Sequence, residues 1–146
     1  MSKIGRASRN ASLLRVETVS ADKTISSAES GELYFLDGST EGNITVTLPA
    51  AKAGAYLTFV LVAASNAATE IKVAAPSGQI RGTVEYQAAG TTAGDAQRRV
   101  KAAIAASDLV FADASVLGSR LELVCDGTNW LILRAESSAA WRTSFS

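Results

Sequence analysis

Two segments of the chain each carry an apolar run that stops at an Asp-Gly pair and then resumes in alternation. They span residues 33–49, with the pair at 37–38, and residues 120–133, with the pair at 126–127. Gly tolerates positive φ and Asp hydrogen-bonds back onto a turn, so this combination is typical of two strands joined by a tight turn. We therefore predict strand, turn and strand in each segment, and neither segment contains a residue suited to chemistry.

Alternation of apolar and polar side chains predicts further strands. Residues 43–48 and 79–86 alternate strictly, which is typical of strands with one buried face and one wet face. Residues 56–62 instead carry apolar side chains at nearly every position. We expect this segment to form a central strand that is covered on both sides and is the most buried of the set.

Residues 95–106 are the one segment that favours a helix. Asp95 suits an N-cap, the following residues are good helix formers, and Val100 and Ile104 stand four positions apart. The rest of the chain reads as about ten short strands separated by turn residues. We predict an all-β fold, either an antiparallel β-sandwich of jelly-roll-like type or a compact barrel, with at most one short helix.

The composition limits both the core and the chemistry. A chain of 146 residues, 47% hydrophobic but only 6% aromatic, can form one domain with a mainly aliphatic core. Histidine is absent, which removes Ser-His-Asp and Cys-His nucleophiles and the commonest zinc ligand.

The single cysteine, Cys125, suits a reducing compartment and is predicted to be buried. Trp130 is also expected in the core, because it begins an alternating strand.

The sequence contains none of the common motifs for catalysis, cofactor binding or metal binding. We therefore predict a protein that is not an enzyme, with no catalytic residue, no cofactor and no metal ligand. Scattered carboxylates leave a glycosidase pair open, since such a pair needs only two carboxylates opposed across a cleft. The candidates are Glu32, Glu41, Glu85 and Glu122.

The N-terminal residues 1–12 form a basic arm, although the whole chain has 14 basic and 14 acidic residues and no net charge. Lys3, Arg6, Arg9 and Arg15 all precede the first acidic residue. The arm is either a solvated tail or a segment that docks on an acidic partner surface, with nucleic acid a weaker third alternative. It has no apolar segment of the kind that secretory signals need, and no run of the chain is long enough to span a membrane, so we expect use without export.

A tail at residues 136–146 follows the β-domain, which we place at residues 13–135. The tail contains two large aromatic side chains, Trp141 and Phe145, after a small polar linker. Such residues are expected either to pack back on their own domain or to dock against a neighbouring subunit, and the sequence gives these alternatives equal weight.

Four segments of the β-domain follow one another in a characteristic order. They are residues 24–37, with Gly-Glu-Leu-Tyr-Phe-Leu-Asp, residues 44–54, with Thr-Val-Thr-Leu-Pro, residues 56–62, and residues 117–133, with Asp-Gly-Thr-Asn-Trp. This order resembles the small β-rich virion proteins of tailed bacteriophages, which decorate capsids or form modules of tail fibres. The resemblance covers roughly residues 24–133, and its motifs are structural rather than chemical.

The resemblance implies a capsid decoration, or cement, protein on the outer surface of the virion, assembled in the host cytoplasm. Such a protein binds the major capsid protein and stabilises the shell, commonly as a homotrimer, and neither nucleic acid nor a membrane is an expected partner. The alternative is a tail-fibre or receptor-binding module that contacts a host surface glycan or protein. The missing shaft repeat favours decoration. The predicted contacts to the shell or to a sister subunit are Lys3, Arg6, Arg9, Arg15, Trp141 and Phe145.

Overall fold

The computed structural model describes residues 15–26, 30–39, 42–63, 69–88, 98–113 and 115–145. These residues form eleven strands and, within the described ranges, no helix, which confirms the all-β prediction. The strands are β1 (Val16–Val19), β2 (Lys23–Thr24), β3 (Leu33–Asp37), β4 (Ile44–Thr47), β5 (Tyr56–Ala63), β6 (Ile71–Ala74), β7 (Ile80–Ala88), β8 (Arg98–Ala106), β9 (Asp108–Phe111), β10 (Arg120–Cys125) and β11 (Trp130–Ser137).

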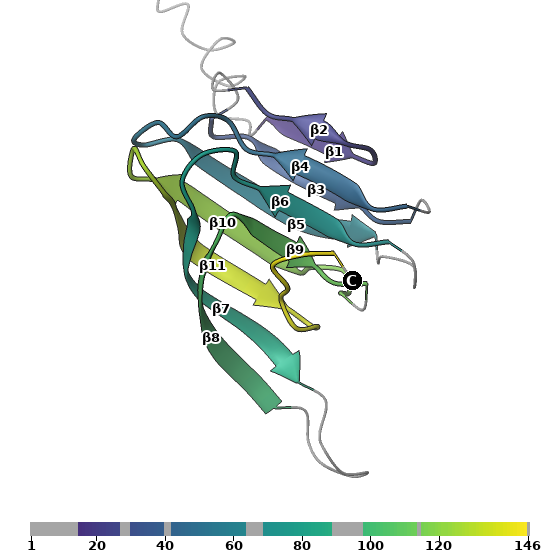
Figure 1. Cartoon of the computed structure of the whole chain (residues 1–146). Coiled ribbons are helices and arrows are strands. Elements are labelled where there is room, and N and C mark those ends of the chain that lie inside the picture. Colours follow the sequence, from purple (N-terminus) through teal and green to yellow (C-terminus); the bar gives the residue numbers. More distant parts are fainter. Residues whose placement is uncertain are drawn as a thin grey trace, which may run out of the picture.

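The strands form two sheets, one in the order β1-β3-β5-β10-β11-β7-β8 and a smaller one in the order β2-β4-β6-β9. In Figure 1 the smaller sheet runs beside β1, β3, β5 and β10, whereas β7 and β8 lie at the far end. Neither sheet closes on itself, so the architecture is an open two-layer sandwich. The sheets are mixed rather than purely antiparallel, because β1–β3, β3–β5, β2–β4, β4–β6 and β7–β11 are parallel pairs.

From β1 to β6 the chain passes back and forth between the two sheets, and each strand lies parallel to the preceding strand of its sheet. Equivalent side chains stack in register. Val19 pairs with Leu36, and Leu36 pairs with Leu61 in the large sheet, while Val46 pairs with Val73 in the small one. All five are buried. We call this half of the molecule the parallel coils, because it repeats a two-strand unit as a short β-solenoid does.

The first Asp-Gly segment is therefore not a hairpin, and that part of the sequence prediction is wrong. β3 belongs to the large sheet and β4 to the small one, so the link between them crosses from one layer to the other. Asp37 does form a local turn, since its carboxylate accepts hydrogen bonds from the backbone N–H of Ser39 at 2.9 Å and from its hydroxyl at 2.6 Å. A turn reverses the chain locally but does not determine which sheet the next strand joins.

The second Asp-Gly segment is the hairpin that the sequence predicts. β10 and β11 pair antiparallel, and the Asp126 carboxylate accepts hydrogen bonds from the N–H groups of Thr128 at 2.8 Å and Asn129 at 2.7 Å. These backbone hydrogen bonds hold the pKa of Asp126 below its ordinary value. Gly127 supplies a φ of 103°, a conformation that side-chain-bearing residues rarely adopt. The finished hairpin lies between β5 and β7 in the large sheet.

Residues 98–106 form strand β8, so the helix predicted over residues 95–106 is wrong. Asp95, its expected N-cap, lies outside the described residues. Val100 and Ile104 share the half-buried face of the strand, because positions four apart lie on one face in a strand as well as in a helix. A continuous antiparallel register with β7, from Arg98 to Ala106, supplies the backbone pairing that overrides helix propensity.

The core lies between the two sheets and is mainly aliphatic. Trp130 and Cys125 are 0% and 2% exposed, which confirms their predicted burial. The Sγ of Cys125 accepts a hydrogen bond from the Gly127 N–H at 3.3 Å, so the thiol takes part in the β10–β11 turn. Tyr34 and Phe59 stack with their ring centroids 5.4 Å apart, joining β3 to β5 under the small sheet.

Candidate functional site

Of the predicted contact residues in the basic arm, Lys3, Arg6 and Arg9 lie outside the described residues. Arg15 is described and lies beside Glu32, with its Nη1 3.2 Å from the carboxylate Oε1. The Arg15 side chain is 76% exposed, whereas that of Glu32 is 10% exposed. Most of the Arg15 guanidinium is therefore accessible to a partner, although Glu32 neutralises part of its charge.

Trp141 packs on its own domain, which is one of the two alternatives that the sequence left open. It is 8% exposed, and its ring centroid lies 4.6 Å from that of Phe111 in β9. Its Nε1–H donates a hydrogen bond to the backbone carbonyl of Glu85 in β7 at 3.1 Å. Trp141 thus joins the small sheet to the large one and has little surface left for a second protein.

Arg142 fixes the chain next to Trp141 on the edge of the small sheet. Its backbone forms an antiparallel bridge with Val110 of β9. Its guanidinium contacts the carboxylate of Glu70, whose side chain is only 3% exposed, and lies 3.8 Å from that of Asp113. A buried carboxylate needs such a partner, so this ion pair ties Arg142 to the end of the β6–β9 pair where Ile71 lies opposite Phe111.

Phe145, the other aromatic residue of the tail, lies on the same edge. The ammonium of Lys72 in β6 stands 4.7 Å from its ring centroid, a cation–π contact, and the ring is half-buried. β11 runs to Ser137, two residues further than the predicted end of the β-domain. We call residues 138–145 the closing tail, because they cover the β9 edge of the sandwich.

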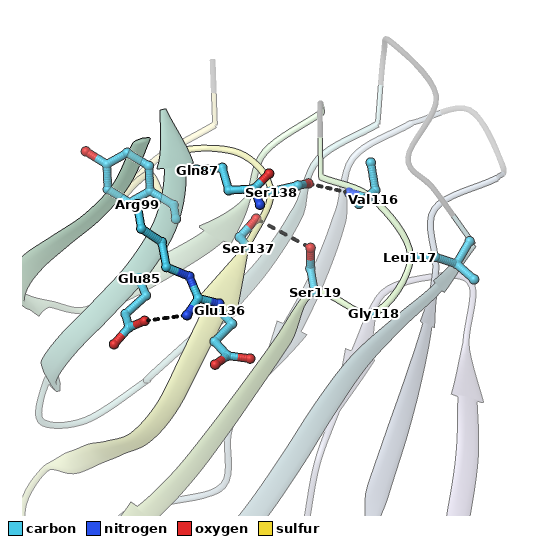
Figure 2. Close-up of a pocket in the computed structure, with 11 residues that line it drawn as sticks. Glu85, Gln87, Arg99, Val116, Leu117, Gly118, Ser119, Glu136, Ser137 and Ser138 are labelled. Atoms are coloured by element: carbon cyan, nitrogen blue, oxygen red, sulfur yellow. Dashed lines mark hydrogen bonds and ion pairs between the residues drawn. The ribbon is translucent and has the colours of Figure 1, made fainter. Parts of the chain in front are cut away.

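A polar hollow of about 210 Å³ opens where β7 and β11 end beside residues 116–119. Figure 2 shows serine side chains from β11 and the loop on one side of it, and the ion pair of Arg99 and Glu85 on the other. The nearest Arg99 and Glu85 atoms are 3.6 Å apart. Ser138 accepts a hydrogen bond from the Val116 N–H at 2.9 Å, and the hydroxyls of Ser119 and Ser137 are 3.5 Å apart.

The side chains around the polar hollow pair with one another and with the backbone. The hydrogen bond from Lys101, at 2.7 Å, holds the pKa of Glu85 below its ordinary value, and the charges of Lys101, Arg99 and Arg134 act in the same direction. Glu85 is therefore ionised at neutral pH and is not a proton donor. The serines already bind one another and the backbone, with no histidine in the sequence to activate them.

The four carboxylates that left a glycosidase open do not form an opposed pair in the part of the chain that the structure describes. Glu41 lies outside that part. Glu32 precedes β3, and strands β5, β10 and β11 separate it from Glu85 in β7. Glu122 lies on the outward side of β10, opposite Arg134 in β11.

The outer face, by which we mean the side of the large sheet turned away from the small sheet, carries an apolar surface that the sequence analysis missed. β5 was expected to be covered on both sides, but no second layer within the described residues covers this side, and its side chains there are half-buried. The apolar side chains on this side come from strands β1, β3, β5, β10 and β11. They are Val16, Leu33, Phe35, Tyr56, Val60, Val124 and Leu131.

Paired charges border these apolar residues. Glu136 lies 3.1 Å from Arg134 and 3.8 Å from Arg120. Glu85 of β7 pairs with Lys101 of β8. A bulge in β11 leaves Leu133 without a partner in β10, and Leu133 is 60% exposed next to Arg134. The signal for this face was present in the two-sided apolar pattern of residues 56–62, which we interpreted as double coverage.

The described residues contain no cluster of side chains suited to a metal ion and no helix of the length and apolarity that a membrane crossing requires. Comparison with protein-family models and with the curated proteins finds no match to this chain.

Proposed function

We propose that this protein is a virion structural protein of a tailed bacteriophage, which decorates and stabilises the outer capsid shell by binding the major capsid protein. The ordered strand motifs of residues 24–133 support this proposal, since they resemble those of small β-rich virion proteins. The body is compatible with this role, because its two stacked sheets hold a broad surface in place.

The outer face is the observation that carries the proposal. Seven strands about 4.8 Å apart and about 17 Å long give a face of roughly 600 Å² before side-chain relief, close to the area that one partner contributes to a standard interface. Its apolar residues are bordered by paired charges, which is the usual arrangement of protein–protein contacts. A small ligand would not need so broad a surface.

The basic arm supplies the second set of contacts in this proposal. Lys3, Arg6, Arg9 and the accessible Arg15 would bind acidic groups of the shell, and several weak contacts on one chain add up to firm attachment. Trp141 is not assigned a contact, because it is buried against its own domain. The site of action is the outer surface of the virion.

Binding to shells that lack decoration tests the proposal. The purified protein should bind saturably and raise the resistance of the shells to heat or low ionic strength. Leu133→Lys should weaken binding by about tenfold, because it places a charge in the apolar contact. The matched control is Leu117→Lys, since Leu117 is 64% exposed against 60% for Leu133 but lies in the polar hollow.

The outcomes separate the protein's role from the choice of surface. Failure of the unmodified protein to bind shells would contradict the decoration proposal. Normal binding by Leu133→Lys, or equal losses in both variants, would show that the outer face is not the attachment surface.

The parallel coils favour a second candidate, a tail-fibre module that contacts a host surface glycan or protein. Shafts of solenoid type are built from stacked coils of this kind, and β1–β6 supply a short run of them. The copy number in purified particles distinguishes the two, since a shell protein is present on the scale of the capsid lattice and a fibre protein in few copies. Mass spectrometry of virions gives that number.

A further inference from the structure

β8 is the exposed end of the large sheet. It pairs with β7 over its whole length in an uninterrupted register from Arg98 to Ala106, and within the described residues no strand pairs with its other side. Figure 1 shows β7 and β8 at the end of the molecule furthest from β1 and β2. An edge of this length presents a row of backbone N–H and C=O groups that can pair with another strand.

The small sheet does not cover this edge. It ends at β9, and Trp141 of the closing tail reaches only as far as the Glu85 carbonyl of β7. The inward side chains of β8, Val100, Ala102 and Ile104, are consequently half-buried, whereas Leu109 at the end of the small sheet is 0% exposed.

Two of the usual means of blocking an edge strand, proline and a β-bulge, are missing from β8. Residues 98–106 contain no Pro or Gly, and their register with β7 has no bulge. Two basic side chains, Arg99 and Lys101, lie on its outward side. Both are beside the carboxylate of Glu85, which offsets part of the charge that would repel another strand.

We propose that β8 is an interaction surface for a second copy of this chain, and that the two β8 strands pair antiparallel about Ala102. In that register Val100 lies opposite the partner's Ile104, and Ile104 lies opposite the partner's Val100. β-Branched pairs of this kind stabilise antiparallel strands. The two large sheets then become one continuous sheet, with both small sheets on the same side of it.

The charges of β8 fit the same register. Arg99 lies opposite the partner's Ala105, and Lys101 lies opposite the partner's Ala103, so no two basic side chains face each other directly. Like charges placed directly opposite would oppose pairing. Three basic residues at one end of β8 and alanines at the other end make the strand self-complementary only when the two copies run antiparallel.

This contact closes on itself, because a two-fold axis through Ala102 uses the same edge of both copies. The expected assembly is therefore a dimer, in contrast to the homotrimer that the resemblance to decoration proteins implies. The inference does not depend on the proposed function, since it concerns only how two copies of the chain meet.

Crosslinking of single-cysteine variants tests the register. Ala102→Cys places the two copies' thiols about 5 Å apart across the axis, whereas Ala105→Cys places them about 20 Å apart along the paired strands. A mild oxidant or a short bis-maleimide should crosslink Ala102→Cys efficiently and Ala105→Cys hardly at all. Ala105 is the more exposed of the two residues, so crosslinking through random collisions would be more efficient for Ala105→Cys than for Ala102→Cys. The native Cys125 is only 2% exposed and should not react.

A pair of charge variants tests the register without cysteines. Ala103→Glu with Ala105→Glu places acids opposite the partner's Lys101 and Arg99 and should tighten the dimer by about tenfold, while lysines at both positions should weaken it by a similar factor. Both positions are exposed, so the fold is expected to survive either change. Sedimentation velocity over a range of concentrations measures the association, and circular dichroism checks the fold.

Three results would overturn the proposal. One is a monomer at every concentration, and the second is a trimer, which would indicate a head-to-tail contact. The third is protection from hydrogen exchange, equal at all dilutions, of the β8 amides that do not bond to β7, since another segment of the same chain would then cover the edge. Protection of β8 that grows with concentration, together with crosslinking at Ala102, is the expected result.

Discussion

The two sheets end in different ways, and the contrast explains where the molecule is closed and where it is open. The small sheet ends at β9, and the closing tail covers that edge through the backbone bridge of Arg142 to Val110 and the ring of Trp141 against Phe111. The large sheet ends at β8, where the described residues supply no comparable cover. The covered edge belongs to the core, and the open one is the edge at which we propose that two copies of the chain pair.

The difference shows that position in a sheet does not by itself determine burial. β8 and β9 are both terminal strands with apolar residues on their inner sides, yet Leu109 is fully buried and Ile104 is half-buried. A second layer and a covering segment make the difference, and both are supplied by parts of the chain distant in sequence.

Trp141→Ala should cause the largest loss of stability among substitutions in the closing tail, because it removes the side chain that joins β9 to β7. We expect a decrease of about 3 kcal/mol in the free energy of unfolding, as for other buried Trp truncations. Urea denaturation measures it. A decrease below about 1 kcal/mol would mean that the closing tail is not part of the cooperative core.

Arg142→Ala should cost about 2 kcal/mol, because the deeply buried Glu70 carboxylate loses its ion-pair partner. Arg134→Ala is the matched control, since Arg134 also pairs with a glutamate, but on the solvated outer face. That control should leave the stability unchanged in the same urea titration. Equal effects of the two substitutions would contradict the structural role of the closing tail.

Ile104→Ala should cost only about 1 kcal/mol at the open edge, whereas Leu109→Ala at the covered edge should cost about 3 kcal/mol. The measurement is made at a protein concentration low enough to dissociate any dimer. A larger loss at Ile104 than at Leu109 would show that the β8 edge is covered in solution.

Lowering the pH should have the smallest effect. The pKa of Glu85 in the folded protein lies below its ordinary value of 4.5, mainly through the hydrogen bond from Lys101. The resulting stabilisation is present above pH 4.5 and is lost as the pH falls through the lowered pKa. Solvent screening keeps it small.

A carbon NMR titration of the Glu85 carboxyl group checks this prediction. Lys101→Ala should raise the pKa of Glu85 toward its ordinary value. Lys72→Ala should not, because Lys72 pairs with Asp108 in the small sheet. An unchanged pKa in Lys101→Ala would show that the hydrogen bond at β8 does not persist in solution.

Local patterns predicted the strands well but not their partners. The alternation of residues 79–86 and the Asp126 turn led to the right elements, because each depends on neighbours in sequence. The same Asp-Gly signal at Asp37 gave the wrong topology, because the crossing to the small sheet depends on stacking against strands further along the chain. β8 was mistaken for a helix, since Val100 and Ile104 fit both periods.

The candidate surfaces were predicted less well than the fold. The sequence identified Trp141 as important but left open whether it packs inward, because Phe111, its contact, lies 30 residues earlier in the chain. The outer face was missed because an apolar residue that faces solvent and one that faces a second layer look identical in a sequence.

The β10–β11 hairpin follows the nine other described strands in the sequence, yet it lies in the middle of the large sheet. Until it leaves the ribosome, β5 and β7 each lack the neighbour that they have in the finished fold. The large sheet cannot be completed before this hairpin has been synthesised, so we expect the domain to fold only once residues 120–137 are available. Chains terminated before residue 130 are expected to aggregate rather than to accumulate as folded fragments.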